Sequence, residues 1–382
     1  MATDIHSKAF DDGTQIKLYI LREYLKQWLP VFLNRRETIW KKIFIYDFFA
    51  GEGSDVEGNI GSPLITLNQL KPYCTRIKSE KIEVKVVFNE YLKKKSKKLE
   101  QLCQQHLVQC KTDMDSPIPC PNSKVDSGCV FKLLIENKDF GDFFQEIYSQ
   151  MVLFPEMPRF MFLDQYGVKH ITEEIFRNII ALQRTDFIFF ISSSFARRFI
   201  GNPEFQRYLK LTNQDFDNNK PHHCHRVMYN YYKSLVPTDK KFYLAPFSIK
   251  KNQNIYGLIF GTHHSLGIEK FLNVGWKINE HTGDANYDID DEKINPSEPK
   301  LFAQFDTPTK IQLFERELRT KIELKELLTN HEIYEFAFES GVLPKHANKV
   351  IQELKNEGKI QRNFSTAAQN IHNLGLSVIT IK

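Results

Sequence analysis

Four acidic residues end or closely follow apolar runs of the kind that form buried β-strands, and their carboxylates could all contact one ligand. The four acids are Asp47, Glu90, Asp139 and Asp164. In a parallel sheet, ligands bind at the carboxyl ends of the strands, so side chains at these ends collect around a single site. One acid after a strand is common, but four at corresponding positions predict a binding site for a polar ligand.

A glycine-rich loop follows the first of these acids. Gly51 and Gly53 come directly after the apolar run 44–50, and a helical pattern begins at Pro63. A strand, glycine loop and helix in this order place bare backbone N–H groups and a helix N-terminus beside a ligand, which suits a nucleotide-like cofactor. The loop lacks the Gly-Lys-Ser/Thr of a phosphate-binding P-loop. A purely structural turn is the alternative interpretation.

The next two acids are suited to the nucleoside part of such a cofactor. The carboxylate of Glu90 offers two acceptor oxygens to the two hydroxyls of a ribose. Asp139 and Phe140 follow the third apolar run, residues 130–135, and could bind adenine through a hydrogen bond and a ring contact.

The apolar runs alternate with helical patterns along the first 280 residues. Runs at 160–163 and 187–191 complete five expected core strands, and runs at 242–247 and 255–261 are expected to form a closing hairpin. Continuous apolar strands separated by helices are typical of a parallel sheet that is covered on both faces. The sequence therefore predicts an α/β fold: a mostly parallel, doubly wound, Rossmann-like sheet in a domain over residues 1–280, with insertions at about 111–127 and 200–240.

A second module is expected after residue 300. Residues 281–300 are acidic and polar and are predicted to form a linker or loop. Helical patterns at 322–329, 332–340 and 344–356 precede two short strand patterns, an order that resembles a winged helix-turn-helix domain over residues 301–382. The third helix carries cations that could contact phosphates, or could equally lie on a solvated or protein-binding face. These residues are Lys345, His346, Lys349 and Lys355, with Lys359 just beyond the helix.

The run Asp47-Phe48-Phe49-Ala50-Gly51-Glu52-Gly53 resembles the first motif of class I S-adenosylmethionine (SAM) methyltransferases. With its other motifs, the chain resembles the three-Cys-motif partner (TcmP) family of class I methyltransferase-like bacterial proteins. The matching segments are 18–25, 47–53, 61–65, 88–90, 163–167, 258–262 and 276–277. The resemblance implies a class I methyltransferase fold, SAM as the cofactor, and a partner protein that carries three cysteines and is similar to radical-SAM enzymes.

The same resemblance assigns roles to individual residues. The cofactor-binding residues it implies are Asp47, Phe49, Gly51, Gly53, Glu90, Asp139 and Phe140. One departure concerns the segment after the fourth strand. Relatives resemble Asp-Pro-Tyr-Gly there, whereas Gln165 replaces the proline in this chain. Asp164 and Tyr166 remain available, but the geometry that the proline presets is lost.

Two functions are compatible with these residues. The first is a SAM-dependent methyltransferase that acts on a nucleic acid, for example on an amino group of a base. Asp164 would then accept a hydrogen bond from the target amino group, and Tyr166 would stack on a base that has left its helix. Gln165 would also contact this substrate. Arg197 and Arg198 could bind its phosphates, since guanidinium groups match phosphate oxygens.

The second function is a non-catalytic scaffold for the three-cysteine partner, which the loss of the proline favours. In that case Asp164 could simply cap the helix expected near Thr172 or the intervening turn, with Tyr166 filling the edge of the sheet.

Composition narrows the class of protein. The 382 residues carry a formal net charge of +5, which permits DNA or RNA as a partner without requiring it. No apolar run approaches the ~20 residues that span a bilayer, and the N-terminus has no signal-peptide pattern. We therefore expect a cytoplasmic protein without membrane contact. The six cysteines include no Cys-x-x-Cys pair, and the adjacent residues 222–225 cannot easily converge on one ion, so no metal site is predicted.

Overall fold

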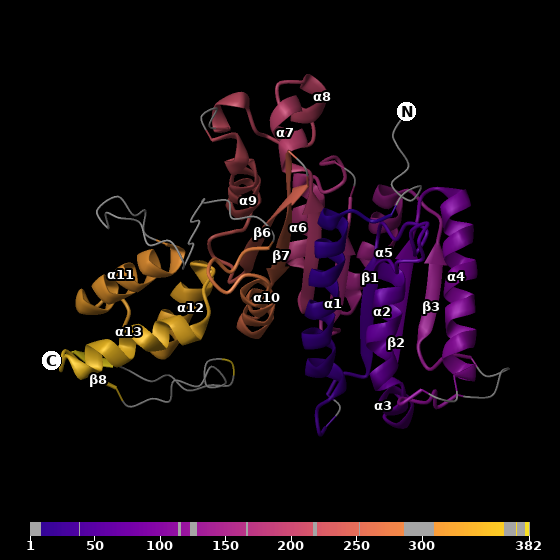
Figure 1. Ribbon diagram of the computed structural model, residues 1–382, viewed down its shortest axis with the longest axis horizontal. Coiled ribbons are helices and arrows are strands. Elements are labelled where there is room, and N and C mark those ends of the chain that lie inside the picture. The colour runs from indigo at the N-terminus through magenta and orange to yellow at the C-terminus, as the bar shows by residue number, and fades with distance from the viewer. Residues whose placement is uncertain are drawn as a thin grey trace.

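The computed structural model describes residues 9–37, 39–113, 116–122, 128–165, 167–216, 220–251, 253–285, 309–362, 372 and 379–381. These residues form an α/β domain and a smaller helical module that packs against one end of it (Figure 1). Tyr166 and residues 286–300, most of the predicted linker, lie outside the described residues.

The core of the α/β domain is a seven-stranded sheet with the order β3-β2-β1-β4-β5-β7-β6. Its strands are β1 (Lys42–Asp47), β2 (Glu83–Asn89), β3 (Lys132–Glu136), β4 (Arg159–Leu163), β5 (Thr185–Ile191), β6 (Tyr243–Lys251) and β7 (Asn254–Thr262). The first five strands are parallel, and β7 is antiparallel to both β5 and β6. This order, with one antiparallel strand inserted beside β5, is that of class I methyltransferases. The predicted fold class is confirmed.

Helices cover both faces of the sheet (Figure 1). One face carries α1 (Asp12–Leu33), α2 (Ser62–Leu70), α3 (Cys74–Ser79), α4 (Lys93–Thr112) and α10 (Ser265–Ile278). The other carries α5 (Phe140–Leu153), α6 (Glu173–Ala181), α7 (Ser193–Phe199) and α9 (Cys224–Ser234). The short α8 (Pro203–Gln206) and the 3₁₀ turns η2 (Lys71–Tyr73), η3 (Asn213–Asp215) and η4 (Pro221–His223) lie in the connections. None of the helices in the described ranges is both long and apolar enough to cross a bilayer.

Alternation along β1 divides the hydrophobic core in two. Ile43 and Ile45 pack with the helices of the first face, whereas Tyr46 packs with those of the second. Successive side chains of a strand point to opposite faces, so a strand that is apolar throughout needs helices on both sides. This requirement explains why the apolar runs in the sequence identify the core strands.

The first helix is capped at its N-terminus and hydrogen-bonded to the sheet at its middle. At its N-terminus, Asp11 accepts a hydrogen bond from the Thr14 N–H at 2.9 Å. Further along, the fully buried Tyr24 donates its hydroxyl proton to Asp186 Oδ2 at 2.7 Å. Pro30 lies inside the last turns of α1, and the helix continues to Leu33. The start of this helix lies beside the carboxyl edge of the sheet, where Lys17 contacts Asp164 after β4.

The C-terminal module consists of three helices and a two-stranded antiparallel wing. These elements are α11 (Lys310–Glu323), α12 (Asn330–Glu339), α13 (Pro344–Asn356), β8 (Ile360–Arg362) and β9 (Ile379–Ile381). The helix predicted at 322–329 is wrong. A capping box between Thr309 and Gln312 begins the helix earlier, and Lys325, with a φ of 63°, lies just beyond its end. The other two predicted helices are confirmed.

Trp276 of α10 joins the module to the α/β domain. Its indole N–H donates to the carbonyl of Gly341 at 3.2 Å, and its ring lies 4.6 Å from that of His346. Gly341 has a φ of 69° at the end of α12, a conformation that favours glycine. The two parts are thus held together by a buried aromatic contact.

Candidate functional site

A cavity of ≈ 270 Å³ lies at the carboxyl edge of the sheet. Its walls come from the start of α1, the loop after β1, the segments after β2 and β4, and the β6–β7 hairpin. Six of the predicted site residues line it: Phe49, Gly51, Gly53, Glu90, Asp164 and Gln165. The structure therefore brings together residues that are up to 116 positions apart in the sequence.

The glycine loop forms part of the wall of this cavity, and it has no room for a side chain at Gly53. Gly53 has a φ of 89°, and a Cβ there would lie only 2.9 Å from Leu102 Cδ2 of α4. The loop folds back on itself, with the Gly61 N–H donating to the Gly53 carbonyl at 2.8 Å. Gly61 then caps α2 without a side-chain hydrogen bond. The first backbone N–H groups of α2 consequently begin at the cavity wall, where Gly61 and Ser62 lie.

Glu90 is held in a fixed orientation between the loop and α4. Its Oε2 accepts a hydrogen bond from the Gly51 N–H at 3.1 Å, and its Oε1 accepts one from the Leu92 N–H at 2.7 Å. A carboxylate has about four acceptor positions, so each oxygen retains one for a ligand. The preceding Asn89 is buried and bonds to the carbonyls of Phe48 and Lys138, which ties three strand ends together.

Asp47 lies behind the loop and does not line the cavity itself. Its Oδ1 accepts a hydrogen bond from the Phe49 N–H at 3.2 Å, while its buried Oδ2 has no hydrogen-bond partner among the described residues. Burial is the main cause that raises the pKa of Asp47 to about 7. Ser62 and the Phe49 N–H oppose this shift, and the nearby Asp164 and Lys17 have smaller effects, raising and lowering respectively. A buried carboxyl with a vacant acceptor oxygen would be stabilised by a neighbouring positive charge.

Lys17 is a site residue that the sequence analysis did not identify. Its side chain is only 10% exposed and lines the cavity, where Nζ forms an ion pair with Asp164 Oδ2. The same ammonium lies 4.7 Å from the centre of the Phe190 ring. Lys17 stands four residues before Leu21 on the apolar face of α1, and a lysine on such a face was the pattern that could have revealed it.

The segment after β4 places Asp164 and Gln165 side by side in the cavity wall. Gln165 is 1% exposed, and its Oε1 accepts hydrogen bonds from the N–H groups of His170 and Ile171 at 3.0 and 3.2 Å. The alternative that Asp164 caps the following helix is wrong, because Thr172 caps α6 through the Ile175 N–H. Tyr166, the predicted stacking residue, lies outside the described residues.

Asp139 and Phe140 do not reach the cavity. Asp139 is exposed and caps α5 by accepting a hydrogen bond from the Gly141 N–H at 2.8 Å. Phe140 is 2% exposed, and its ring lies 4.9 Å from that of Phe49, which does line the cavity. Their proposed contacts with adenine stay predictions, since a bound nucleoside would have to extend beyond the cavity to reach Asp139.

Arg197 and Arg198 lie on α7, away from the cavity walls. Arg198 donates to Asn254 Oδ1 at 3.0 Å. Arg197 lines a separate cavity of ≈ 160 Å³, together with Lys220 and Arg226. Their role as phosphate-binding residues stays a prediction, and the structure assigns them to the polar region around α7 and α9.

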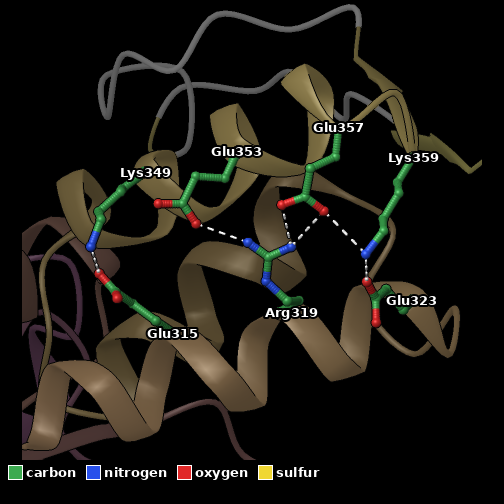
Figure 2. A network of polar contacts seen from close by, with 7 residues as sticks. All are labelled: Glu315, Arg319, Glu323, Lys349, Glu353, Glu357 and Lys359. Carbon is green, nitrogen blue, oxygen red and sulfur yellow. Dashed lines mark hydrogen bonds and ion pairs between the residues drawn. The ribbon is translucent and has the colours of Figure 1, made fainter.

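The cations of the C-terminal module are partly neutralised within it (Figure 2). Lys349 Nζ lies 2.7 Å from Glu315 Oε1, and Lys359 Nζ lies 2.8 Å from Glu323 Oε1. Between them, Arg319 bonds to Glu353 and Glu357 at 2.9 Å each. Burial lowers the pKa of His346 to about 4, with further lowering by Lys345, Lys310 and Lys349, so its ring is neutral near pH 7. Lys345 and Lys355 are exposed on α13.

The sequence of the C-terminal module matches a known family of winged-helix domains. Residues 288–363 match the GMT-like wHTH domain family. This match includes α11, α12, α13 and β8, and the predicted winged helix-turn-helix module is confirmed. Among curated proteins, none is significantly similar in sequence to this chain.

Solved methyltransferase structures are similar to the chain at very low identity. Trm1 from Pyrococcus horikoshii, solved with S-adenosyl-L-methionine, is 10% identical, and the match covers 97% of this chain and 91% of that chain with a TM-score of 0.37. An O-methyltransferase from Bacillus cereus in complex with SAH is 12% identical over 68% of this chain and 83% of that chain, with a TM-score of 0.32. The METTL16 methyltransferase domain is 7% identical over 64% and 83% of the two chains, with a TM-score of 0.29.

Proposed function

We propose that the chain is a SAM-dependent methyltransferase that acts on a nucleic acid, for example on an exocyclic amino group of a base. The observation that carries the proposal is the cavity at the carboxyl edge of the sheet. It collects a glycine loop, a fixed carboxylate after β2 and an acid after β4. Ligands of doubly wound folds bind at this edge.

The residues around the cavity fit SAM. Glu90 would accept hydrogen bonds from the ribose hydroxyls with the acceptor positions that Gly51 and Leu92 leave vacant. The loop from Phe49 to Gly53 and the start of α2 would face the amino-acid end with backbone N–H groups. Asp47, whose buried Oδ2 has no hydrogen-bond partner in the part of the chain that the structure describes, would attract the ammonium and sulfonium charges from behind the loop. Phe140 would contribute indirectly by supporting the ring of Phe49.

Methyl transfer from SAM requires little acid–base catalysis by the protein. When bound, SAM supplies a methyl group that is already activated by the sulfonium. The task of the protein is then to position the acceptor, which accounts for most of the rate in such reactions. Asp164 would accept a hydrogen bond from the target N–H and orient the nitrogen lone pair. Lys17 would hold the Asp164 carboxylate in place through its ion pair and its contact with Phe190.

A nucleic acid is proposed as the acceptor for two reasons. One is the formal net charge of +5 of the chain, and the other is the position that the acceptor group must reach. A base must leave its stack to reach a methyl donor at the bottom of a cavity, and Tyr166 would stack on it there. Arg197 and Arg198 lie beyond the hairpin side of the cavity, on α7, where phosphates of the same strand could meet them.

A second function is also proposed, because three observations favour it. Asp164 is already engaged by Lys17, and Gln165 replaces the proline of the family that the chain resembles. Both are compatible with a scaffold that has kept the cofactor fold and that serves as a partner of a three-cysteine protein similar to radical-SAM enzymes. The paired cations of the C-terminal module also suit a protein partner better than phosphates.

Transfer of a labelled methyl group separates the two functions. Tritiated SAM is incubated with the protein and with pools of DNA, RNA and protein, and label is counted in each pool. The methyltransferase proposal predicts label in DNA or RNA that disappears with Asp164→Ala, while SAM affinity changes little. Label in none of the pools, with SAM binding intact, would favour the scaffold.

A further inference from the structure

The start of α4 concentrates positive charge beside the candidate cofactor site. Five of its first six residues, Lys93–Lys98, are lysines, and the other is Ser96. Because α4 follows β2, its first turn lies near the carboxyl edge of the sheet, and Lys95 lines the cavity there (Figure 1). The lysine run therefore borders the cavity on its β2 side.

These lysines oppose the formation of the helix that they begin. The N-terminus of a helix carries a partial positive charge, which favours Asp or Glu in the first turn, and α4 has neither there. Its N-cap, Leu92, supplies no side-chain hydrogen bond. Like charges four residues apart, such as those of Lys93 and Lys97, repel each other on the helix surface. A local pattern that lowers stability without a compensating contact is typical of a functional surface.

Three of the lysines also have no opposing charge nearby. Lys93, Lys94 and Lys97 are exposed, and no carboxylate lies within ion-pair distance of them in the part of the chain that the structure describes. Lys98 differs, since its Nζ lies 2.8 Å from Oε2 of Glu52 in the glycine loop. Three positive charges are thus available to an anionic partner.

An exposed aromatic ring accompanies these charges. Tyr91 is 66% exposed, and Leu92 beside it is 50% exposed. The backbone below the ring is held in place, because Asn137 Nδ2 donates to the carbonyls of Glu90 and Tyr91 at 2.7 and 2.8 Å. Proteins bind single-stranded nucleic acids with this combination of groups, since bases stack on the aromatic ring while the cations contact phosphates.

We propose that Tyr91 and the exposed lysines at the start of α4 form a docking surface for a single-stranded segment of DNA or RNA. In this inference, which rests on the proposed methyl transfer to a nucleic acid, Lys93, Lys94 and Lys97 contact phosphates and Tyr91 stacks on one base. A single strand fits this surface better than a duplex does, because only an unpaired base can present its face to the ring.

The topology places this surface across the cavity from the arginines of α7. In the sheet, β1 and β4 lie between β2, which α4 follows, and β5, which α7 follows. With about 4.8 Å between neighbouring strands, the ends of β2 and β5 are about 14 Å apart. A short extended strand can span this distance, from the lysines of α4 past Asp164 to the start of α7.

Fluorescence anisotropy with labelled single-stranded oligonucleotides tests the docking surface, with DNA and RNA in separate titrations. The intact protein is compared with a triple variant that carries Lys93→Gln, Lys94→Gln and Lys97→Gln. The slope of log affinity against log salt concentration should fall by about 2 in this variant, since each neutralised phosphate of a single strand contributes about 0.7. The difference in affinity between the two proteins should therefore grow about 100-fold for each tenfold dilution of salt. SAM affinity, measured by calorimetry, should stay the same.

Matched variants separate the effects of charge, ring and helix stability. A control with the same change in net charge carries Lys345→Gln, Lys349→Gln and Lys355→Gln on α13, and it should keep the wild-type slope. Tyr91→Ala should weaken binding about 5- to 150-fold at every salt concentration, whereas Tyr91→Phe should keep most of the affinity. The α4 triple variant should melt at a higher temperature than wild type at low ionic strength, because repulsion within the helix is removed.

Four results would overturn the docking surface. These are no binding of either oligonucleotide, the same salt slope in wild type and in the α4 variant, a larger loss of slope in the α13 control, and a lower melting temperature of the α4 variant. Binding only to vesicles that contain phosphatidylserine would also overturn it, in favour of a membrane surface.

Methyl transfer distinguishes failure of this inference from failure of the proposed function. Oligonucleotides that bind through α4 but accept no labelled methyl group would support the docking surface and contradict the methyltransferase. Oligonucleotides that are labelled and bound equally well by wild type and by the α4 variant would support the methyltransferase and contradict the docking surface.

Discussion

Replacing Glu90 by alanine is the perturbation that bears most closely on the cofactor site. Glu90 accepts hydrogen bonds from the Gly51 N–H at 3.1 Å and from the Leu92 N–H at 2.7 Å, and under the proposed function it also accepts them from the ribose. Losing hydrogen bonds to a charged group costs about 1.5–3 kcal/mol. Because each 1.4 kcal/mol is a tenfold change in affinity, SAM should bind about 10- to 150-fold more weakly.

Isothermal titration calorimetry of three variants with SAM measures this effect. Glu90→Gln keeps the shape of the side chain but not its charge, so its loss of affinity should lie between those of wild type and Glu90→Ala. Glu52→Ala is the control, because Glu52 lies in the same loop, bonds to Lys98 at 2.8 Å and does not line the cavity. Wild-type affinity in a folded Glu90→Ala protein would refute the reasoning, and so would an equal loss in Glu52→Ala.

Three further predictions concern other parts of the chain. Burial raises the pKa of Asp47 from 3.8 to about 7, so the folded protein holds this proton more tightly than the unfolded chain. Asp47 therefore lowers the stability of the fold as pH rises from about 4 to about 7. Asp47→Asn should therefore flatten the fall in melting temperature between about pH 4 and pH 7. An unchanged slope would contradict the buried carboxyl. Lys17→Met leaves Asp164 without its ion pair and should lower the free energy of unfolding in urea by about 1–3 kcal/mol. Lys17→Arg should lose less, and equal urea midpoints for wild type and both variants would argue against the ion pair. Arg319→Ala should destabilise the protein at low ionic strength, and the difference should vanish near 1 M salt as exposed charges are screened; a salt-independent loss would mean that Arg319 acts through packing.

The strands and their polar ends followed from the sequence because their pattern is local. A buried parallel strand is apolar along its whole length, so β1, β2 and β4 stood out, and the acids that follow them necessarily share one edge of the sheet. The start of α11 was missed although two local cues were present. Phe314, Leu318 and Ile322 recur every four residues along its buried face, and Thr309 and Gln312 form a capping box.

Contacts between distant segments could not be predicted in the same way. The ion pair between Lys17 and Asp164 joins residues 147 positions apart, and only the packing of α1 on the sheet brings them together. Cys74 and Cys129 likewise line the same small cavity although they come from different connections of the sheet. Asp139 was correctly predicted to follow a strand, but its role could not be predicted from the pattern alone. Its carboxylate caps the N-terminus of α5.

Direct measurement of cofactor binding tests the central claim most simply. The intact protein is titrated with SAM and with its demethylated product in a calorimeter. We predict saturable binding of both, with dissociation constants between about 1 μM and 0.2 mM, equivalent to about −5 to −8 kcal/mol. Absence of measurable heat or competition for either ligand, in protein that is folded, would contradict the assignment of the cavity as a SAM site.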